Sequence, residues 1–395
     1  MPRKIRLAAG LRTLHKEERL TLLNNSELHA RIAEQLANAA AGLSNKKSVI
    51  GFDGFVDEII RAVDKRQSPE EYSTISTLAK FAERIAKAAG KSTNVELVVQ
   101  NMKLGGNGPI MANALASFGM RVTCIGNLGY PNLHPVFADF AKRAHVISIA
   151  EPSHTDALEF EDGKLMLGKL ESLNEITYGN LMQRVGGEKL KNLFNEAGLV
   201  GLVNWTMIPA MNDIWKNLLE KILPQLPPNK NRFAFFDLAD PAKRLPADIL
   251  VALDWISRFQ KYFKVILGLN EEESFETANV LGLNTKDNSM KALEALAVEL
   301  RKKLNVHIVV VHPVQCACAA SAENSAAVAG PFDPKPMIST GAGDHFNAGF
   351  CLGNLLGLDL EASLLTGVTT SGFYVRTGKS PALSDLVDFL KNWPV

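Results

Sequence analysis

The sequence is poor in cysteine. Only four of the 395 residues are cysteine, namely Cys124, Cys316, Cys318 and Cys351. Cys316 and Cys318 alternate within a strand-like run, which places both on one face. We interpret them as small, reduced core residues rather than as a disulfide or a metal site. Cysteine that stays reduced fits a cytoplasmic protein.

The sequence also lacks an excess of charge and a long apolar run. Lys and Arg number 43 against 42 Asp and Glu, which gives a formal net charge of +1. This balance gives no electrostatic reason to expect a nucleic acid or an anionic membrane as a partner, so any bound anion needs a local site. No apolar segment reaches membrane-spanning length. The N-terminus starts basic without the apolar stretch of a secretory signal, and we expect a cytoplasmic location.

Short apolar runs rich in β-branched and aromatic residues recur along the chain. They lie at 46–52, 121–126, 145–150, 198–204, 232–238, 264–269 and 305–311. Helical stretches separate most of them, and continuous apolar runs are typical of strands buried on both faces. The alternation predicts an α/β fold: a doubly wound, mostly parallel sheet with helices on both faces.

Three segments do not follow this alternation. Residues 1–45 are rich in Leu and Ala and predict an N-terminal helical extension in front of a main domain over 46–395. Residues 61–104 and 155–177 are predicted as insertions, the second with a hairpin turn at 161–164. Together they form a small β-sheet appendage with two open uses, a lid over a cleft or a dimerisation surface.

The stretch STGAGDHFNAGFCLG places four glycines and one carboxylate before an apolar helical run. At a helix start, Gly341, Ala342 and Gly343 leave backbone N–H groups open to an anion. Asp344 follows in the first turn. A hydroxyl that attacks a phosphoryl group must lose its proton, and a positioned Asp accepts it. The stretch predicts an anion hole with a general base, against the simpler interpretation of a helix start with a capping acid.

Two further motifs lie on the same side of the predicted sheet. Asp53 and Asp57 follow the first strand, where ligands bind in open α/β sheets, unless they are an ordinary loop acid and a capping acid. Gly105, Gly106 and Asn107 precede a helix and allow a close approach of the backbone. Their spacing is not the dinucleotide-binding fingerprint, and a simple strand-to-helix turn is the alternative.

A third motif follows a later strand. Asn270 and Glu273 lie three residues apart at a predicted helix start. The simpler interpretation is a capping box, in which each side chain bonds the backbone N–H of the other residue. The functional one is that Glu273 reaches a Mg²⁺ ion or its waters.

Taken in order, these motifs resemble those of a known family. GFDGFVDEI, GGNGPIMANALASFG, NEEE, STGAGDHFNAGF and TSGFYVRTGKSP are similar to the motifs of the ribokinase-like carbohydrate kinases, also called the phosphofructokinase-B family. The resemblance covers about residues 46–395, and GAGD is its most specific part. It implies a β-sheet lid over the sugar site. It also implies an enzyme that transfers the γ-phosphoryl group of ATP to a hydroxyl of a sugar or sugar-like molecule, with Mg²⁺.

The resemblance gives each motif a role. Asp344 matches the catalytic base, and Gly341, Ala342 and Gly343 match the anion hole for the transferred phosphoryl group. The residues matched on the substrate side are Asp53, Asp57, Gly105, Gly106 and Asn107. Those expected on the nucleotide side, with Glu273 near the Mg²⁺, are Asn270, Glu273, His312, Thr340 and Ser371.

Two departures from the family pattern leave alternatives open. The family usually has Asn at the position of Ile110, where it holds the sugar, so the sugar stays open. The glycine turn after VVV is replaced by His312 and Pro313, which is reminiscent of the ADP-dependent sugar kinases. We expect His312 to be a satisfied polar residue near the nucleotide. The sequence around Asp344 favours ATP; an ADP-dependent sugar kinase, or a catalytically degenerate sugar or nucleotide sensor, are the alternatives.

Two last expectations concern substrate and assembly. Apart from Arg61, no cluster of Lys or Arg stands beside Asp57 in the sequence, which favours an unphosphorylated sugar. A lid of a few strands leaves an apolar face or an open edge, so we expect a homodimer through the lid. The role of the N-terminal helices and any dependence on monovalent cations stay open.

Overall fold

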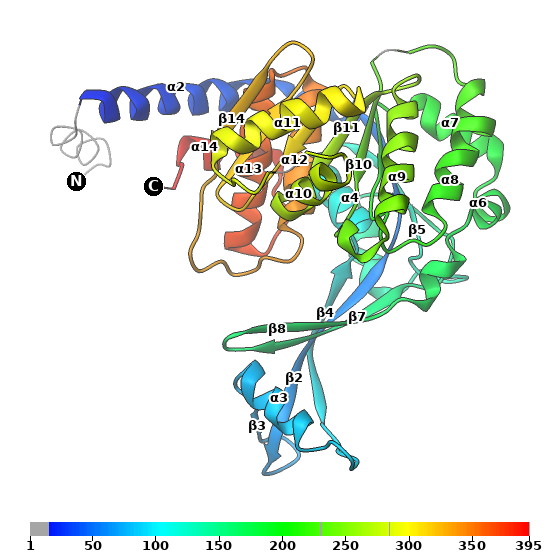
Figure 1. The fold of residues 1–395 in the computed structure, drawn as a ribbon, viewed down its shortest axis with the longest axis vertical. Coiled ribbons are helices and arrows are strands. Elements are labelled where there is room, and N and C mark those ends of the chain that lie inside the picture. Colours follow the sequence, from blue (N-terminus) through cyan, green and yellow to red (C-terminus); the bar gives the residue numbers. More distant parts are fainter. Residues whose placement is uncertain (1–15, 230, 284, 395) are drawn as a thin grey trace.

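A nine-stranded sheet lies at the centre of the computed structural model, which describes residues 16–229, 231–283 and 285–394 (Figure 1). Its strand order is β14-β13-β12-β11-β10-β9-β1-β5-β6. The strands from β6 to β12 in this order are parallel, and β13 and β14 are antiparallel at one edge. The strands are β1 (Lys47–Phe52), β5 (Arg121–Gly126), β6 (His145–Ser148), β9 (Leu199–Leu202), β10 (Phe233–Asp237), β11 (Lys264–Leu269), β12 (Ile308–Val311), β13 (Cys316–Ala320) and β14 (Ser325–Ala329).

Every strand predicted from an apolar run is present in this sheet, and apart from the edge strand β6 these strands consist mainly of buried residues. The predicted fold class is confirmed. Cys316 and Cys318 lie on β13, and the cysteines of the described residues are free thiols. The antiparallel hairpin of β13 with β14 was not predicted, since β14 is short and consists mainly of alanine.

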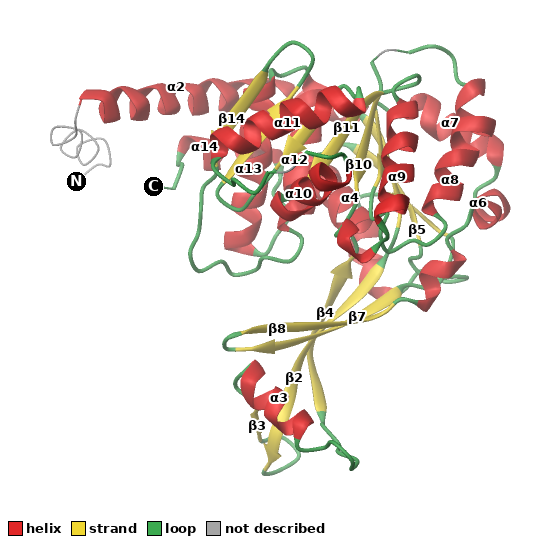
Figure 2. Cartoon of the chain, in the orientation of Figure 1, coloured by secondary structure: helices red, strands yellow, loops and turns green. Residues whose placement is uncertain are grey.

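Helices cover both faces of the sheet (Figure 2). One face packs against α6 (Tyr178–Arg184), α7 (Gly187–Glu196), α8 (Met211–Asn217), α9 (Pro246–Phe259), α10 (Glu271–Val280) and α11 (Met290–Leu304). The other face packs against α2 (Lys16–Ala39), α4 (Asn107–Ser117), α5 (Ala138–Ala141), α12 (Ala342–Leu356), α13 (Leu360–Thr377) and α14 (Leu383–Lys391). Within the described residues, no helix is long and apolar enough to cross a membrane.

The N-terminal extension is part of this second helical layer. Ile32, Ala33 and Leu36 of α2 are fully buried in its core, and the ring of His29 lies 4.3 Å from that of Trp393 beyond α14. A 3-10 helix over Ala40–Asn45 then leads into β1. Residues 1–15 of the predicted extension lie outside the described part of the chain, and the boundary at residue 45 stays a prediction.

A second, five-stranded sheet projects from the main domain (Figures 1 and 2). Its strands are β2 (Phe55–Arg66), β3 (Tyr72–Thr74), β4 (Leu97–Gly105), β7 (Ser153–Phe160) and β8 (Gly163–Lys169). β2 is its longest strand and pairs with β3, β4 and β7, while the β7–β8 hairpin turns at 161–162 as predicted. We call this sheet the lid. Only Asp53 and Gly54 separate β2 from β1, so the lid insertions span 55–105 and 153–169, starting earlier than the sequence pattern indicated.

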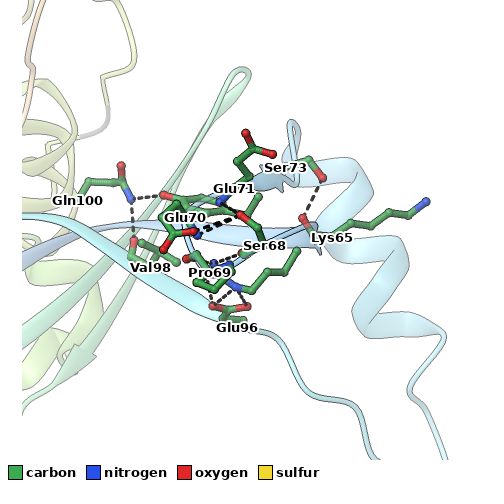
Figure 3. A network of polar contacts seen from close by, with 11 residues as sticks. Lys65, Ser68, Pro69, Glu70, Glu71, Ser73, Glu96, Val98 and Gln100 are labelled. Carbon is green, nitrogen blue, oxygen red and sulfur yellow. Dashed lines mark hydrogen bonds and ion pairs between the residues drawn. The ribbon is translucent and has the colours of Figure 1, made fainter.

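The far end of the lid is held by a small core and a polar network (Figure 3). α3 (Leu78–Ala86) packs on the buried side chains of Ile60, Leu158 and Phe160. The guanidinium of Arg66, at the end of β2, pairs with Glu96, which precedes β4. Exposed ion pairs contribute little to stability, so the apolar contacts under α3 carry most of it.

Close packing of α12 on α13 holds the start of α12 in place. A Cβ added at Gly349 of α12 would lie 2.3 Å from Oγ1 of Thr370, and one at Gly353 would lie 2.7 Å from Cα of Ser363. These distances are too short for any side chain. The two glycines therefore allow the backbones to approach closely, and they fix the position of the turn that carries Asp344.

We expect Gly349→Ala to lower the free energy of unfolding by about 1–3 kcal/mol, because the added methyl overpacks this interface. Gly187→Ala, in α7, is the matched control: its nearest neighbour would lie at 3.6 Å, and we expect a change within about 0.5 kcal/mol. Urea denaturation followed by circular dichroism measures both. If Gly349→Ala and Gly187→Ala have the same free energy of unfolding, the close packing of α12 on α13 does not contribute to stability.

Candidate active site

Five buried carboxylates meet where the main sheet faces the lid. Asp53 follows β1, Asp237 ends β10, Glu273 lies in the first turn of α10 after β11, and Asp344 lies in the first turn of α12. Asp57 lies on β2 of the lid. Their exposed fractions are between 0 and 8%. Carboxylates are rarely buried this far without a function or a partner, and the carboxyl ends of parallel strands are where α/β sheets bind ligands.

Asp53 is tied to three hydrogen-bond donors. It accepts from the backbone N–H of Asn107 at 2.9 Å and of Gly108 at 2.7 Å, and from Nδ2 of Asn204 at 2.7 Å. Burial raises the pKa of Asp53 to about 6, although these bonds oppose the rise. Gly106 has a φ of +95°, and a Cβ on Gly108 would lie 2.7 Å from Oδ1 of Asp53. Asp53 thus shapes the glycine turn, and its part as a sugar ligand stays a prediction.

Asp57 lies on the face of the lid that is turned to the site. Its neighbours across the strands are Lys103 on β4 and Thr155 on β7. Burial raises the pKa of Asp57, and the charges of Lys103 and Lys164 and a hydrogen bond from Thr155 oppose the rise. A Cβ on Gly105 would lie 2.4 Å from Oδ1 of Asp57, so only glycine leaves room for this carboxylate.

The expectation that Asp57 has no basic neighbour apart from Arg61 is wrong. Arg61 donates instead to the backbone oxygen of Glu159 at 2.8 Å. The basic neighbours are Lys103 and Lys164, which lie far from Asp57 in the sequence and are brought to it by strand pairing. Because their position depends on long-range register, the local sequence held no signal for them.

The GAGD turn begins α12. Gly341 is the N-cap, with a φ of +91° that favours glycine. The backbone N–H of Ala342 donates to the oxygen of Ser339 at 3.1 Å. In the described chain, the N–H groups of Gly341 and Gly343 have no protein acceptor. The groups open to an anion are therefore those of the two glycines, while that of Ala342 stabilises the turn itself.

A polar network holds the backbone oxygens of this turn. The sequence analysis did not predict it. Nδ1 of His345 lies 2.7 Å from the oxygen of Gly341, and its Nε2 lies 2.8 Å from Oγ of Ser380. Burial lowers the pKa of His345 to about 4, so the ring is neutral. Tyr374 stacks on it at 3.7 Å and donates its hydroxyl to the oxygen of Thr340 at 2.8 Å. Both residues lie on helices inside motifs that the sequence analysis singled out, but no role was assigned to either side chain.

Asp344 is surrounded by negative charge. Its pKa lies well above the usual range, first because the carboxyl is buried and then because Asp237 and Asp53 are near; a hydrogen bond from Asn107 opposes the rise. Asp237 was missed by the sequence analysis, although it ends a buried strand as Asp53 does. It accepts from the N–H of Ala239 and from Nδ2 of Asn347, both at 2.8 Å. Burial and the neighbouring carboxylates therefore disfavour the ionised forms of Asp237 and Asp344.

Asn270 and Glu273 form a complete capping box. The N–H of Glu273 donates to Oδ1 of Asn270 at 3.0 Å, and the N–H of Asn270 donates to Oε2 of Glu273 at 2.9 Å. The other oxygen of Glu273 accepts from the N–H of Asp240 at 2.9 Å. The simpler interpretation of this motif is confirmed, and a contact of Glu273 with Mg²⁺ stays a prediction. Among the described residues, no group of three His, Cys, Asp or Glu side chains has the arrangement of a metal site.

A cavity of about 340 Å³ lies next to the GAGD turn. Its lining includes Ala342 and Gly343 of the turn, residues of the loop 330–336, and Ser371 and Gly372 of α13. Of the residues expected on the nucleotide side, Asn270, His312 and Ser371 line this cavity. Glu273 and Thr340 do not, although each is hydrogen-bonded to residues near it.

His312 differs from its expectation. The ring stacks on Phe346 at 4.7 Å, but Nε2 is buried without a hydrogen-bond partner. Burial lowers the pKa of His312 to about 4. A neutral ring with one unsatisfied nitrogen at the wall of a cavity is an available partner for a ligand, since a buried polar group without a partner is unfavourable.

Comparison with known proteins relates the chain to sugar kinases. The model of a family described as prokaryotic ketohexokinase matches residues 25–393. A curated ketohexokinase from Haloferax volcanii is 30% identical over 349 residues, which cover 87% of this chain and 91% of that protein.

Solved structures show the same fold at low sequence identity. Arabidopsis thaliana ribokinase, complexed with ribose and ATP, superposes with a TM-score of 0.59 at 15% identity, covering 88% of this chain and 98% of that one. Ribokinase from Thermotoga maritima gives a TM-score of 0.57 at 18% identity, covering 88% and 99%. At such identities the likeness concerns the fold alone.

The raised pKa of Asp344 generates a prediction for stability. A carboxyl whose pKa is raised in the folded state favours folding below its unfolded pKa, and this contribution is lost as the pH rises through the folded value. We therefore expect Asp344→Asn to change the Tm of the metal-free protein little at pH 4 and to raise it by several degrees at pH 8.

Differential scanning fluorimetry across this pH range measures the effect. Asp254→Asn is the matched control, because Asp254 is an exposed acid on α9. A difference between Asp344→Asn and the native protein that stays constant with pH would contradict the electrostatic account of the site.

Proposed function

We propose that this chain, a carbohydrate kinase that belongs to the prokaryotic ketohexokinase family, transfers the γ-phosphoryl group of ATP to a hydroxyl of a ketohexose. One observation carries the proposal: Asp344 directly follows Gly343, which lines the cavity, and its carboxyl is hydrogen-bonded to Asn107 of the turn that bonds Asp53. The ketohexose is supported by the family and by the Haloferax relative. ATP is supported by its presence in the Arabidopsis ribokinase structure.

The sugar side is polar and built for hydroxyl groups. Asp57 supplies an acceptor, Lys103 a donor and Thr155 a hydroxyl, all on one face of the lid. Asn107 bonds Asp53 through its backbone and Asp344 through its side chain, so it joins the glycine turn to the base. Ile110 is buried with its side chain against Gly341, and the amide that bonds Asp344 is that of Asn107.

The donor side is the cavity. Its walls are apolar and rich in proline, with Pro331 and Pro336 in the loop and Gly372 on α13, which suits a flat purine ring. A nucleotide that enters with its base between these walls extends its phosphates toward Gly343. The free N–H groups of Gly341 and Gly343 then face the terminal phosphate, as anions bind at helix starts.

The residues present fit a Mg²⁺ ion. Magnesium prefers hard oxygen ligands and keeps several waters. Asp237 and Glu273 are carboxylates whose pKa values are raised by burial, Asp237 also by the charge of Glu273, and a divalent cation would compensate this charge. Since both oxygens of Glu273 already accept backbone N–H groups, we expect it to hold the ion through water. When bound, Mg²⁺ would neutralise charge on the phosphates.

In this arrangement the chain does two things for the reaction. Asp344 accepts the proton of the attacking hydroxyl, and its raised pKa makes it a stronger base than an ordinary carboxylate. The turn at 341–343 stabilises the negative charge that moves onto the phosphoryl oxygens. Phosphoryl transfer depends mainly on such positioning and electrostatics.

We expect Asp344→Asn to lower kcat with fructose and MgATP by at least about a hundredfold, because the acceptor of the proton is lost, while binding of ATP stays nearly unchanged. A coupled assay for ADP release and calorimetry with ATP measure the two quantities.

Parallel assays with ADP as the phosphoryl donor test the alternative donor. A tenfold preference for ADP, about 1.4 kcal/mol, would replace ATP in the proposal. Near-normal turnover by Asp344→Asn would show that Asp344 is not the general base. Binding of a sugar or nucleotide without phosphoryl transfer to any sugar would favour a sensor.

We also propose a homodimer that forms through the lid. Leu97, Val99, Met102 and Leu167 lie on the face that is turned away from Asp57, by the alternation of strand residues, and each is more than 40% exposed. Apolar side chains of this number on one sheet face are typical of an interface. A second copy of the lid offers a matching surface.

The double variant Met102→Glu, Leu167→Glu is expected to sediment as a monomer of about 43 kDa at micromolar concentration, because buried charges oppose the interface. Met290→Glu, at an exposed apolar residue of α11, is the control and should leave the dimer intact. Sedimentation of the native protein as a monomer under these conditions would refute the dimer.

A further inference from the structure

The tip of the β7–β8 hairpin, which is part of the lid, contacts the turn that begins α12. Nζ of Lys164, at the start of β8, donates a hydrogen bond of 2.5 Å to Oγ1 of Thr340, although 176 positions separate the two residues. Figure 1 shows the β7–β8 hairpin running beneath the main domain. Thr340 directly precedes Gly341, so the ammonium group lies at the entrance of the proposed anion hole.

Lys164 is also close to the sugar side. Its charge opposes the rise that burial causes in the pKa of Asp57, and it acts on Lys103, whose pKa is lowered first by burial. The hydroxyl of Tyr374 donates to the backbone oxygen of Thr340, and the pKa of Tyr374 is raised first by burial and then by the charges of Asp344 and Asp57. The ammonium of Lys164 therefore lies in the space between the acid that faces the sugar and the start of α12.

The carboxylates gathered at the site favour a cation such as the ammonium of Lys164. Burial and other carboxylates are the leading influences on the pKa values of Asp237 and Asp344. A nucleoside triphosphate adds several negative charges to the same space. The positive charges that act on a carboxylate of this group belong to Lys103 and Lys164, and both lie on the lid. In transfer reactions, a positive group placed where charge develops is among the strongest contributions to catalysis.

We propose that Lys164 is a catalytic residue: a cation carried by the lid that contacts the phosphoryl group while it passes from nucleotide to sugar. This rests on the function proposed above. The sugar oxygen forms a bond to the γ-phosphorus as the bond from that phosphorus to the β–γ bridging oxygen breaks. The hydroxyl proton goes to Asp344, and ADP leaves. Lys164 keeps its own protons and donates a hydrogen bond to a non-bridging oxygen of the group in transfer.

The ammonium group has the donors that this role requires. It carries three N–H groups, and Thr340 uses one of them. The contact with Thr340 fixes the ammonium at the turn, and the remaining donors serve the phosphoryl oxygens. Because Lys164 arrives with the hairpin, the charge is complete only when the lid covers the site. The same arrangement limits transfer of the phosphoryl group to water in the absence of sugar.

Three variants distinguish the effect of the charge of Lys164 from that of its hydrogen bond to Thr340. We expect Lys164→Met to lower kcat about a hundredfold and to change the KM for fructose less than threefold, since the lost interaction is made mainly in the transition state. Thr340→Val removes the partner hydroxyl but keeps the ammonium, and should lower kcat by a clearly smaller factor than Lys164→Met. Lys169→Met is the matched control, because Lys169 lies on the same strand with its side chain on the opposite face, paired with Asp156, and should leave kcat unchanged.

A second measurement does not depend on turnover. The complex of ADP with aluminium fluoride and magnesium mimics the phosphoryl group in transfer, and calorimetry gives its affinity. We expect Lys164→Met to weaken its binding at least tenfold relative to ADP alone, and Lys169→Met to leave it unchanged. If no sugar is phosphorylated by the native protein, the function proposed above fails, while this measurement still tests Lys164.

Two results would overturn the proposal. One is a Lys164→Met variant with kcat and affinity for the mimic within threefold of the native protein. The other is an equal loss of kcat in Lys164→Met and Thr340→Val with unchanged affinity for the mimic, since this would make Lys164 a latch of the lid. All variants alter exposed or half-exposed side chains, so their Tm values should stay within a few degrees and confirm that each is folded.

Discussion

The three hydrogen bonds to Asp53 are the constraint on which the rest of the site depends. They join the end of β1, the turn before α4 and Asn204 after β9, which are elements far apart in the chain. The turn can bond Asp53 only because glycine occupies positions 106 and 108. Once the turn is fixed, Asn107 reaches Asp344, and β2 leaves toward the lid in a fixed direction. A buried carboxylate thus organises both the base and the sugar side.

The charges of the site explain why its residues come from both the main sheet and the lid. The main sheet brings together acids whose mutual repulsion and burial raise their pKa values. The lid brings lysines. In the proposed function, the lysines of the lid and a divalent cation would offset the negative charge that the acids and a nucleotide bring to the same space.

The sequence predicted what is local and left out what depends on register. The parallel strands were predictable because both-face burial produces continuous apolar runs, and the start of α12 because small residues followed by an acid are typical of a helix N-terminus. The basic partners of Asp57 were not predictable, since Lys103 and Lys164 reach it only through strand pairing. Asp237 was missed because it ends an apolar run that reads as an ordinary core strand. His345 lies inside the GAGD motif, but its contacts with Gly341 and Ser380 depend on packing that the local sequence does not show. Which of these residues act on a substrate stays a prediction.

The short link between β1 and β2 has a consequence for how a sugar is received. Asp57 lies four positions after Asp53 on an almost continuous ribbon, so its carboxylate is held by the main sheet before any ligand arrives. Binding there needs little ordering of the chain, and the entropy lost on association is correspondingly small. The tip of the β7–β8 hairpin is held as well: the N–H of Leu78 donates to Asp162 at 2.8 Å, the N–H of Glu161 donates to the oxygen of Ser76 at 2.8 Å, and Lys164 bonds Thr340. In the proposed function, a sugar would therefore meet an acceptor side that is ordered before it binds, and little of its binding free energy would be used to order the chain.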